Sequence, residues 1–229
     1  MRIKPWAKLP VRWIHDGTMA ELFKWRGADA VTGSSAIAAL MIWITLVTQA
    51  EETETDVELL SSVDITYESL MRLTGLSKKL VAAGIDGLKN SNLIIVEKVG
   101  RFNRYILHGY ESGSWTKLPA RALYDKDRIV PFHHFNKRAA CELHALKMYL
   151  YYAAVRDRGN TFTMASFEKI HLKTGVPEKR IPAANGFLIS SGLMVRVESE
   201  QMETGKFKEP NKYFLRGYTD LFLGLSTAS

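Results

Sequence analysis

The sequence has a single cysteine, Cys141, among its 229 residues. One thiol excludes an internal disulfide and any metal site built from several cysteines, and it is typical of a reducing compartment. Long hydrophobic runs are also missing. The most apolar stretch, residues 36–47, is shorter than the roughly 20 residues of a membrane span, and the N-terminus has no apolar signal core. We therefore expect a cytoplasmic protein with no membrane association.

The strong catalytic motifs are missing as well. The sequence shows no Gly-rich phosphate loop, no HExxH zinc motif and no Ser/His/Asp signature. The nearest approach to a ligand cluster is residues 131–135 (PFHHF), which have no carboxylate or cysteine at a useful spacing. We interpret them as an aromatic connector that packs onto the following helix, and Cys141 as a buried small hydrophobe. No enzymatic activity, cofactor or metal site is expected.

What is present is basic charge and an internal repeat. Lys and Arg outnumber Asp and Glu by 31 to 24, which gives a net charge of +7 and favours a polyanionic partner. The segment KLPVR at residues 8–12 recurs as KLPAR at 117–121, and YILHGY at 105–110 recurs as YFLRGY at 213–218. The repeat indicates two copies of one unit, divided near residues 111–115, a turn-rich segment suited to a linker.

The first copy has the following expected elements. A buried helix covers residues 35–50, and an acidic loop covers 51–58. A short strand at 63–65 precedes a helix that Thr66 caps and Gly75 ends, and Ser77 caps a further helix to about residue 90. A hairpin follows over residues 93–107.

The second copy repeats this order. We expect a helix at 137–158, a strand at 161–163, a helix at 164–173, a turn at Gly175 and a helix at 178–190. Pro177 lies where a first helical residue tolerates the missing N–H of proline. Pro182 lies inside that last helix and is expected to delay or kink its start. Strands at 193–197 and 212–215 flank a longer loop. The pattern predicts a helix-rich α+β fold of two tandem winged helix-turn-helix domains, residues 1–112, with an N-terminal extension, and 113–229.

The candidate binding residues follow from this fold. In a helix-turn-helix the second helix enters the major groove of DNA and its first residues reach the base edges. The second helices open with Ser77, Lys78 and Lys79, and with Lys179 and Arg180. The wings carry cations and an amide that suit phosphate contacts, namely Arg101, Asn103, Arg104, Lys206, Lys208 and Lys212. An ordinary solvated surface would carry similar residues.

Three tryptophans crowd the N-terminal segment beside basic residues. Trp6, Trp13 and Trp25 lie among Arg and Lys side chains, a mixture that can stack single-stranded bases. Packing of the segment against the first core is the interpretation we favour.

The chain resembles the plasmid and phage-type replication initiators, in which two winged helix-turn-helix domains bind successive major grooves. The resemblance rests on TGLSKK (74–79) with FNRYIL (102–107), and on TGVPEKR (174–180) with KYFLRGY (212–218). It implies binding to double-stranded DNA at an origin, in the nucleoid or on a plasmid, with host replication proteins or a second copy as partners. A transcriptional regulator of a mobile element and a protein-interaction scaffold are the alternatives.

Overall fold

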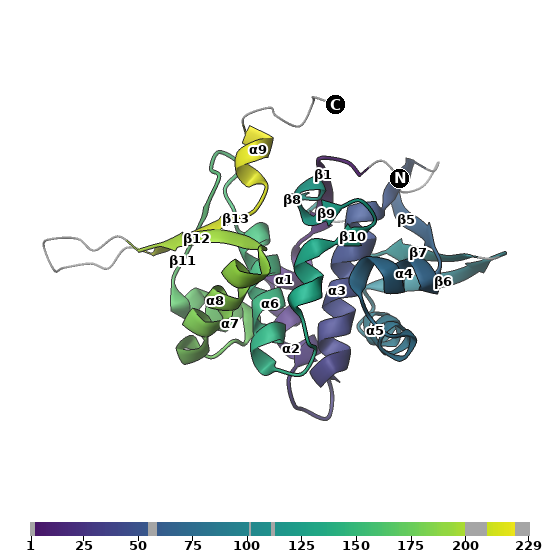
Figure 1. The fold of residues 1–229 in the computed structure, drawn as a ribbon, viewed down its shortest axis with the longest axis horizontal. Helices are drawn as coiled ribbons and strands as arrows, with labels where there is room; N and C mark the ends of the chain where they lie inside the picture. The colour runs from purple at the N-terminus through teal and green to yellow at the C-terminus, as the bar shows by residue number, and fades with distance from the viewer. Residues whose placement is uncertain (1–2, 55–58, 101, 111–112, 200–209, 223–229) are drawn as a thin grey trace, which may run out of the picture.

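The computed structural model describes residues 3–54, 59–100, 102–110, 113–199 and 210–222. Over these residues the chain is an α+β protein with several small sheets, arranged on both sides of a long central helix, α3 (Gly33–Gln49) (Figure 1). Within these ranges no helix is both long and apolar enough to cross a membrane.

The first half follows the expected order of elements. After α3 come β5 (Leu59–Ile65), α4 (Tyr67–Thr74), α5 (Lys78–Asn90), β6 (Ile94–Val99) and β7 (Phe102–Leu107). The predicted ends of the two short helices are confirmed. Thr66 Oγ1 accepts a hydrogen bond from Ser69 N at 3.0 Å, Ser77 Oγ accepts one from Leu80 N at 3.4 Å, and Gly75 between the helices has a φ of +67°.

The acidic segment of the first half is not all loop, which corrects one prediction. Residues Glu51–Glu54 form strand β4, which pairs with β5 and extends the antiparallel sheet to the order β4-β5-β7-β6. Its partner strand supplies backbone hydrogen bonds, and the acidic side chains of an edge strand can stay in water. Residues 55–58 lie outside the described part of the chain.

The second half has the same order with shifted boundaries. Its elements are α6 (Ala140–Ala154), β11 (Thr163–Ala165), α7 (Phe167–Thr174), the 3₁₀ turn η3 (Glu178–Arg180), α8 (Ile181–Ser191), β12 (Met194–Glu198) and β13 (Asn211–Leu215). The strands form a sheet in the order β11-β13-β12, and a short helix, α9 (Tyr218–Phe222), follows.

The first helix of this half is shorter than predicted, for a local reason. The carboxylate of Glu142 accepts hydrogen bonds from the backbone N–H groups of the residues at 136–139. Lys137 among them has a φ of +62°, so this segment wraps around Glu142 instead of continuing the helix. The helix also ends at Ala154, before the predicted Arg158.

The other boundary errors come from Ser166 and the two prolines. Ser166 Oγ caps α7 by accepting from Lys169 N at 3.3 Å, so the residues before it extend strand β11 instead of opening the helix. Pro177 has a ψ of +135° and precedes the helical turns, so it is not the first helical residue. Pro182 delays the start as predicted: α8 begins only at Ile181, after η3.

The two halves are joined by strands that the sequence pattern did not predict. Strand β1 (Trp6–Pro10) pairs antiparallel with β8 (Trp115–Pro119), and Lys8 lies opposite Lys117. Trp115, expected in a linker, therefore begins a strand, and residues 111–112 lie outside the described ranges. Each strand leads into short elements: α1 (Arg12–His15), α2 (Thr18–Leu22), β2 (Phe23–Lys24) and β3 (Val31–Thr32) after β1, and η1 (Arg121–Leu123), β9 (Tyr124–Asp125), β10 (Arg128–Ile129) and η2 (Val130–His134) after β8.

These short elements pack onto the opposite half of the chain. Lys173 Nζ on α7 donates to the backbone oxygen of His15 at 2.5 Å, which ties α1 to the second half. In the other direction, the Tyr124 hydroxyl lies 2.7 Å from Thr48 Oγ1 on α3. The halves therefore share an interface in which each supplies a segment to the other.

The aromatic residues of these connecting segments are packed, with differences from the expectation. Phe132 and Phe135 are buried as predicted, but Phe135 meets Phe187 of α8 at 4.8 Å between ring centroids instead of resting on the following helix alone. Trp13 is buried against Trp43 and Phe23, which confirms packing for this residue. Cys141 is only half-buried beside the core, and this partial burial raises the pKa of its thiol.

Candidate nucleic-acid interface

Helix α5 presents its first residues to solvent. Its inner face is buried, and it approaches α3 so closely that a Cβ added at Gly84 would lie 2.7 Å from Ile42 Cδ1 and 3.0 Å from the Ala38 carbonyl carbon. This close approach fixes which side of α5 faces outward. Lys78 and Lys79 on the opening turn are exposed. Both side chains are therefore accessible from solvent.

The turn before α5 is built from a short hydrogen-bonded motif. Thr74 Oγ1 donates to Leu70 O at 2.6 Å and accepts from Leu76 N at 3.3 Å, while Gly75 adopts the left-handed conformation. Glycine suits this position because an L side chain is disfavoured at positive φ. The motif sets the direction in which α5 leaves α4.

The same turn occurs before η3 and α8. Thr174 Oγ1 donates to Ile170 O at 2.6 Å and accepts from Val176 N at 3.1 Å, and Gly175 has a φ of +68°. The turn delivers Lys179 and Arg180 to the surface, where both are exposed. From Ile181 to Ser191 the sequence of α8 contains no charged residue, whereas α5 carries exposed Asp86 and Lys89. The two segments therefore begin with similar pairs of exposed cations, but α5 carries further charged residues along its outer face and α8 carries none.

Two of the three residues predicted to lie on the first wing, Asn103 and Arg104, have intramolecular partners. Asn103 Nδ2 donates to the Tyr105 hydroxyl at 3.3 Å. Arg104 makes a two-pronged contact with Asp64 on β5, at 2.8 Å for both hydrogen bonds. The hydrogen bond from Arg104 lowers the pKa of Asp64, and the same contact raises the pKa of Arg104. A phosphate would therefore have to compete with Asp64 for the Arg104 guanidinium. The third predicted residue, Arg101, lies outside the described residues.

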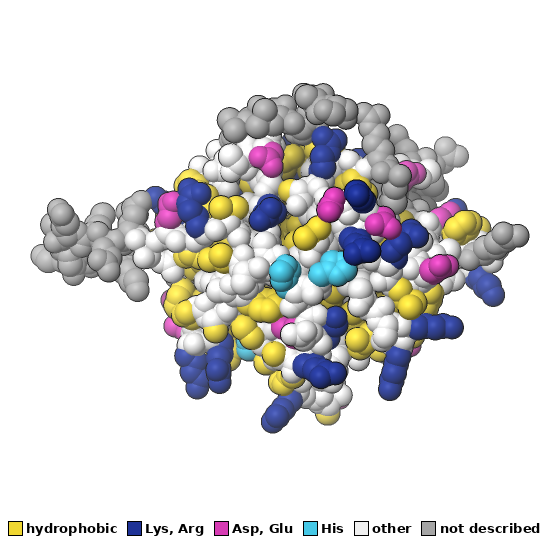
Figure 2. All heavy atoms as spheres, in the orientation of Figure 1, with side chains coloured by type: hydrophobic (Ala, Val, Ile, Leu, Met, Phe, Trp, Pro, Cys, Tyr) yellow, Lys and Arg dark blue, Asp and Glu magenta, His cyan; other side chains and the backbone are white. Residues whose placement is uncertain are grey.

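Of the residues predicted to form the second wing, the structure describes only those on or next to strands β12 and β13. Lys212 on β13 is partly buried, and its Nζ lies 5.6 Å from the centroid of the Phe162 ring. Lys206 and Lys208 lie outside the described residues. Figure 2 shows Lys and Arg side chains projecting along the lower margin of the molecule, on the side where Figure 1 places α2 and α5.

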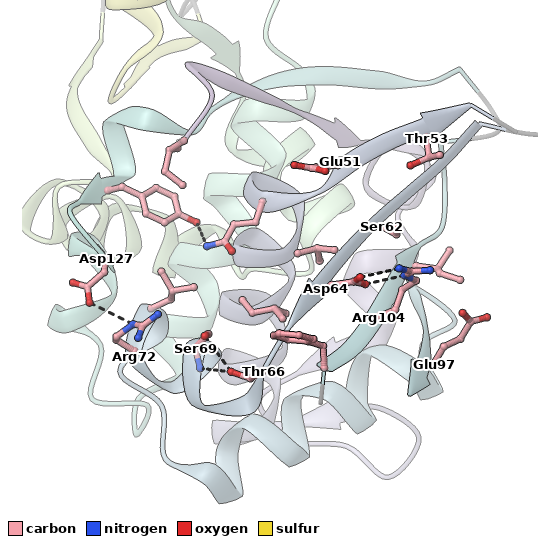
Figure 3. A pocket seen from close by; sticks show the side chains of 18 of the residues that line it. Glu51, Thr53, Ser62, Asp64, Thr66, Ser69, Arg72, Glu97, Arg104 and Asp127 are labelled. Atoms are coloured by element: carbon pink, nitrogen blue, oxygen red, sulfur yellow. Dashed lines mark hydrogen bonds and ion pairs between the residues drawn. The ribbon is translucent and has the colours of Figure 1, made fainter. Parts of the chain in front are cut away.

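A wide groove of about 1250 Å³ lies along the outer face of the first sheet (Figure 3). The Asp64–Arg104 pair lies in it, and Arg72 Nε meets Asp127 Oδ2 at 3.3 Å. Among the described residues there is no group of three metal-ligating side chains. Glu51, Glu97 and Lys126 also line the groove.

Sequence reasoning missed the partner of Arg104 and the junction at β1 and β8. The Asp64–Arg104 contact depends on the register of β5 against β7, which the alternating pattern of one strand does not specify. The junction had a signal, because the paired strands contain the repeated KLP segments.

No protein-family model matches the chain, and the search of curated proteins finds no match.

Proposed function

We propose that the chain is a sequence-specific double-stranded DNA-binding protein, without enzymatic activity, built from two tandem winged helix-turn-helix domains related by an internal pseudo-repeat. The domains are residues 1–112 and 113–229. Support for the fold comes from the strand order, because β5-β7-β6 and β11-β13-β12 both place the first strand beside the last. In each, a helix, a glycine turn and a second helix separate the first strand from the hairpin, as in a winged helix.

Matched contacts support the pseudo-repeat. The Tyr110 hydroxyl donates to Lys8 O at 2.7 Å, and the Tyr218 hydroxyl donates to Lys117 O at 2.8 Å. The two glycine turns described above form a second matched pair, and each wing repeats a bond from an asparagine to a tyrosine two residues later. Contacts of this kind do not follow from composition, so their recurrence favours duplication of one unit.

The observation that carries the proposed function is the exposure of a pair of cations at the opening of each second helix. Lys78 and Lys79 open α5, and Lys179 and Arg180 lie on η3 directly before α8. Each pair follows a glycine turn, and α5 and α8 both have buried inner faces. A helix fixed in this way can enter a major groove, where cations contact phosphates and guanine edges. The net charge of +7 has the sign that a polyanion requires.

Within this class we propose a replication initiator of a plasmid or mobile element, with double-stranded origin DNA and host replication proteins as partners and a second copy as a further one. The resemblance described above supports this role. The alternative is a transcriptional regulator of a mobile element that uses the same fold. Direct repeats bound by single chains support the initiator, and an inverted repeat bound by a two-fold dimer supports the regulator.

The test is selection of bound fragments from a random duplex pool by the purified full chain. We expect one enriched motif, bound more tightly than scrambled DNA by roughly 10³-fold or more. The arrangement of repeats in natural DNA that contains the motif then separates initiator from regulator. Absence of enrichment, with weak salt-sensitive binding to every duplex, would contradict sequence-specific recognition.

A further inference from the structure

The junction between the two halves carries a pair of parallel indole rings. Trp6 on β1 and Trp115 on β8 stack with an interplanar angle of 4° and ring centroids 6.0 Å apart. Both side chains are partly exposed, unlike the buried Trp13 and Trp43. Two half-exposed tryptophans in one orientation form an aromatic surface that is open to solvent.

Cations from three segments surround these rings. Lys117 Nζ lies 4.6 Å from the centroid of Trp6, Lys8 Nζ lies 5.1 Å from that of Trp115, and Arg158 Cζ lies 5.6 Å from Trp115. Lys8 also pairs with Glu52 at 2.5 Å. These contacts contain three cations and one carboxylate, that of Glu52, so the cluster has a net positive charge.

A small pocket adjoins the same cluster. It has a volume of about 280 Å³, and its wall includes Lys4, Trp6, Lys8, Tyr110 and the Lys8 partner Glu52. The Tyr110 hydroxyl is committed to the Lys8 backbone, so the wall on that side is fixed. A planar ring bound there would lie beside an indole and within reach of lysine side chains.

We propose that the Trp6–Trp115 cluster binds single-stranded DNA. Aromatic rings stack on unpaired bases of any sequence, and nearby cations follow the phosphate backbone. A lysine over an exposed indole makes a weak contact compared with a stacked base. On binding, Lys117 and Lys8 therefore turn from the rings toward phosphates, and a base takes the place of each ammonium group.

The position of the cluster is compatible with simultaneous binding of a duplex elsewhere. Strands β1 and β8 lie in the upper part of Figure 1, near the C-terminal end of α3, whereas α5 packs against the Ala38–Ile42 part of that helix. The inference stands apart from the proposed duplex binding, because it uses none of the residues assigned to that function.

The test is fluorescence anisotropy with a labelled oligothymidine of about ten nucleotides, within the site size of small single-strand binding folds, and the full chain. We expect the double variant Trp6→Leu with Trp115→Leu, which keeps apolar side chains in place, to weaken binding by roughly tenfold or more. Oligothymidine should quench part of the tryptophan emission of the wild type and little of that of the variant. Thermal unfolding checks that the variant folds.

A second pair of variants keeps the test decisive if that protein does not fold. Lys117→Gln with Arg158→Gln should weaken oligothymidine binding several-fold, whereas Arg128→Gln, at an exposed arginine on β10, should leave it unchanged. Equal affinities for wild type and both cluster variants would overturn the proposal. Polyglutamate should displace the labelled oligothymidine poorly. If it competed as well as unlabelled oligothymidine, the proposal would be overturned, because binding would then depend on charge alone and not on base stacking.

Discussion

Lys147 Nζ donates a hydrogen bond of 2.8 Å to the backbone oxygen of Phe23, a residue of the other half of the chain. Lys147 is almost fully buried on α6, with only 4% of its surface exposed. Burial lowers its pKa to about 7, and the positive charge of Lys24 acts in the same direction. A lysine that lies at the joint between the halves therefore titrates near neutral pH.

This lysine makes stability depend on pH in a defined direction. Between the folded pKa of about 7 and the ordinary value of 10.5, the unfolded chain binds a proton that the folded chain does not, so the free energy of unfolding rises with pH. The expected slope from Lys147 is on the order of 1 kcal/mol per pH unit. Lys147→Met should remove it, as measured by urea unfolding at two values between about pH 7.5 and 8.5. Lys169→Met, at an exposed lysine, should keep the slope, and equal slopes in all three proteins would contradict the assignment.

Two helical glycines should respond oppositely to alanine. Gly84→Ala forces a Cβ against α3, so we expect a loss of about 1–3 kcal/mol. Gly186 on α8 has nothing within 4 Å of its added Cβ, and Gly186→Ala should stabilise the protein by about 0.5–1 kcal/mol through helix propensity. Chemical unfolding of both variants measures the difference. A Gly84→Ala protein as stable as the wild type would contradict the close approach of α5 to α3.

The sequence predicted the first half better than the second because its helix signals are local. Thr66, Gly75 and Ser77 mark helix ends within a few residues, and the structure confirms them. The sequence pattern failed to predict an element or its boundary where a hydrogen-bond partner outside that element determines it. Strand β4 depends on pairing with β5, and the start of α6 depends on the hydrogen bonds that Glu142 accepts. Strands of two residues, such as β9, have no periodicity to read.

The proposed reading helix gives a prediction about specificity. Lys78→Ala with Lys79→Ala should lower affinity for the selected site by roughly 10- to 100-fold and affinity for scrambled duplex much less, because base contacts carry specificity. The matched control is Lys89→Ala, at the far end of the same helix. Anisotropy titrations on both duplexes at fixed salt measure the effect. Equal reductions on the two duplexes would assign these lysines to phosphate contacts only.

The wing gives a different prediction. Arg101→Ala with Arg104→Ala should weaken binding to selected and scrambled duplexes alike and reduce the salt slope of the affinity by about one for each phosphate that the variant no longer binds. Asp64→Asn, which removes the partner carboxylate of Arg104, should strengthen binding to both duplexes because it frees the guanidinium. The measurement is affinity across a series of salt concentrations. An unchanged slope in the arginine variant would remove this wing from the interface.

The interlocked halves predict a strict spacing between half-sites. Hydrogen bonds such as Lys173 with His15 and Tyr124 with Thr48 run in both directions across the interface, so the two second helices should not move independently. Inserting about half a helical turn, roughly five base pairs, between the half-sites should lower affinity by about tenfold or more, and inserting a full turn of about ten should not restore it. Recovery with the full turn would indicate halves that separate on DNA. Insertions outside the site are the control.

The central claim is that one chain reads DNA through both of its halves, and a hydroxyl-radical footprint at known stoichiometry tests it most directly. We expect a complex of one chain per site that protects two successive major grooves, spaced by roughly one helical turn of 10 base pairs. Lys78→Ala with Lys79→Ala should remove protection in one groove, and Lys179→Ala with Arg180→Ala in the other. Protection of a single groove by one chain, with the second groove covered only when a second chain binds, would contradict the account.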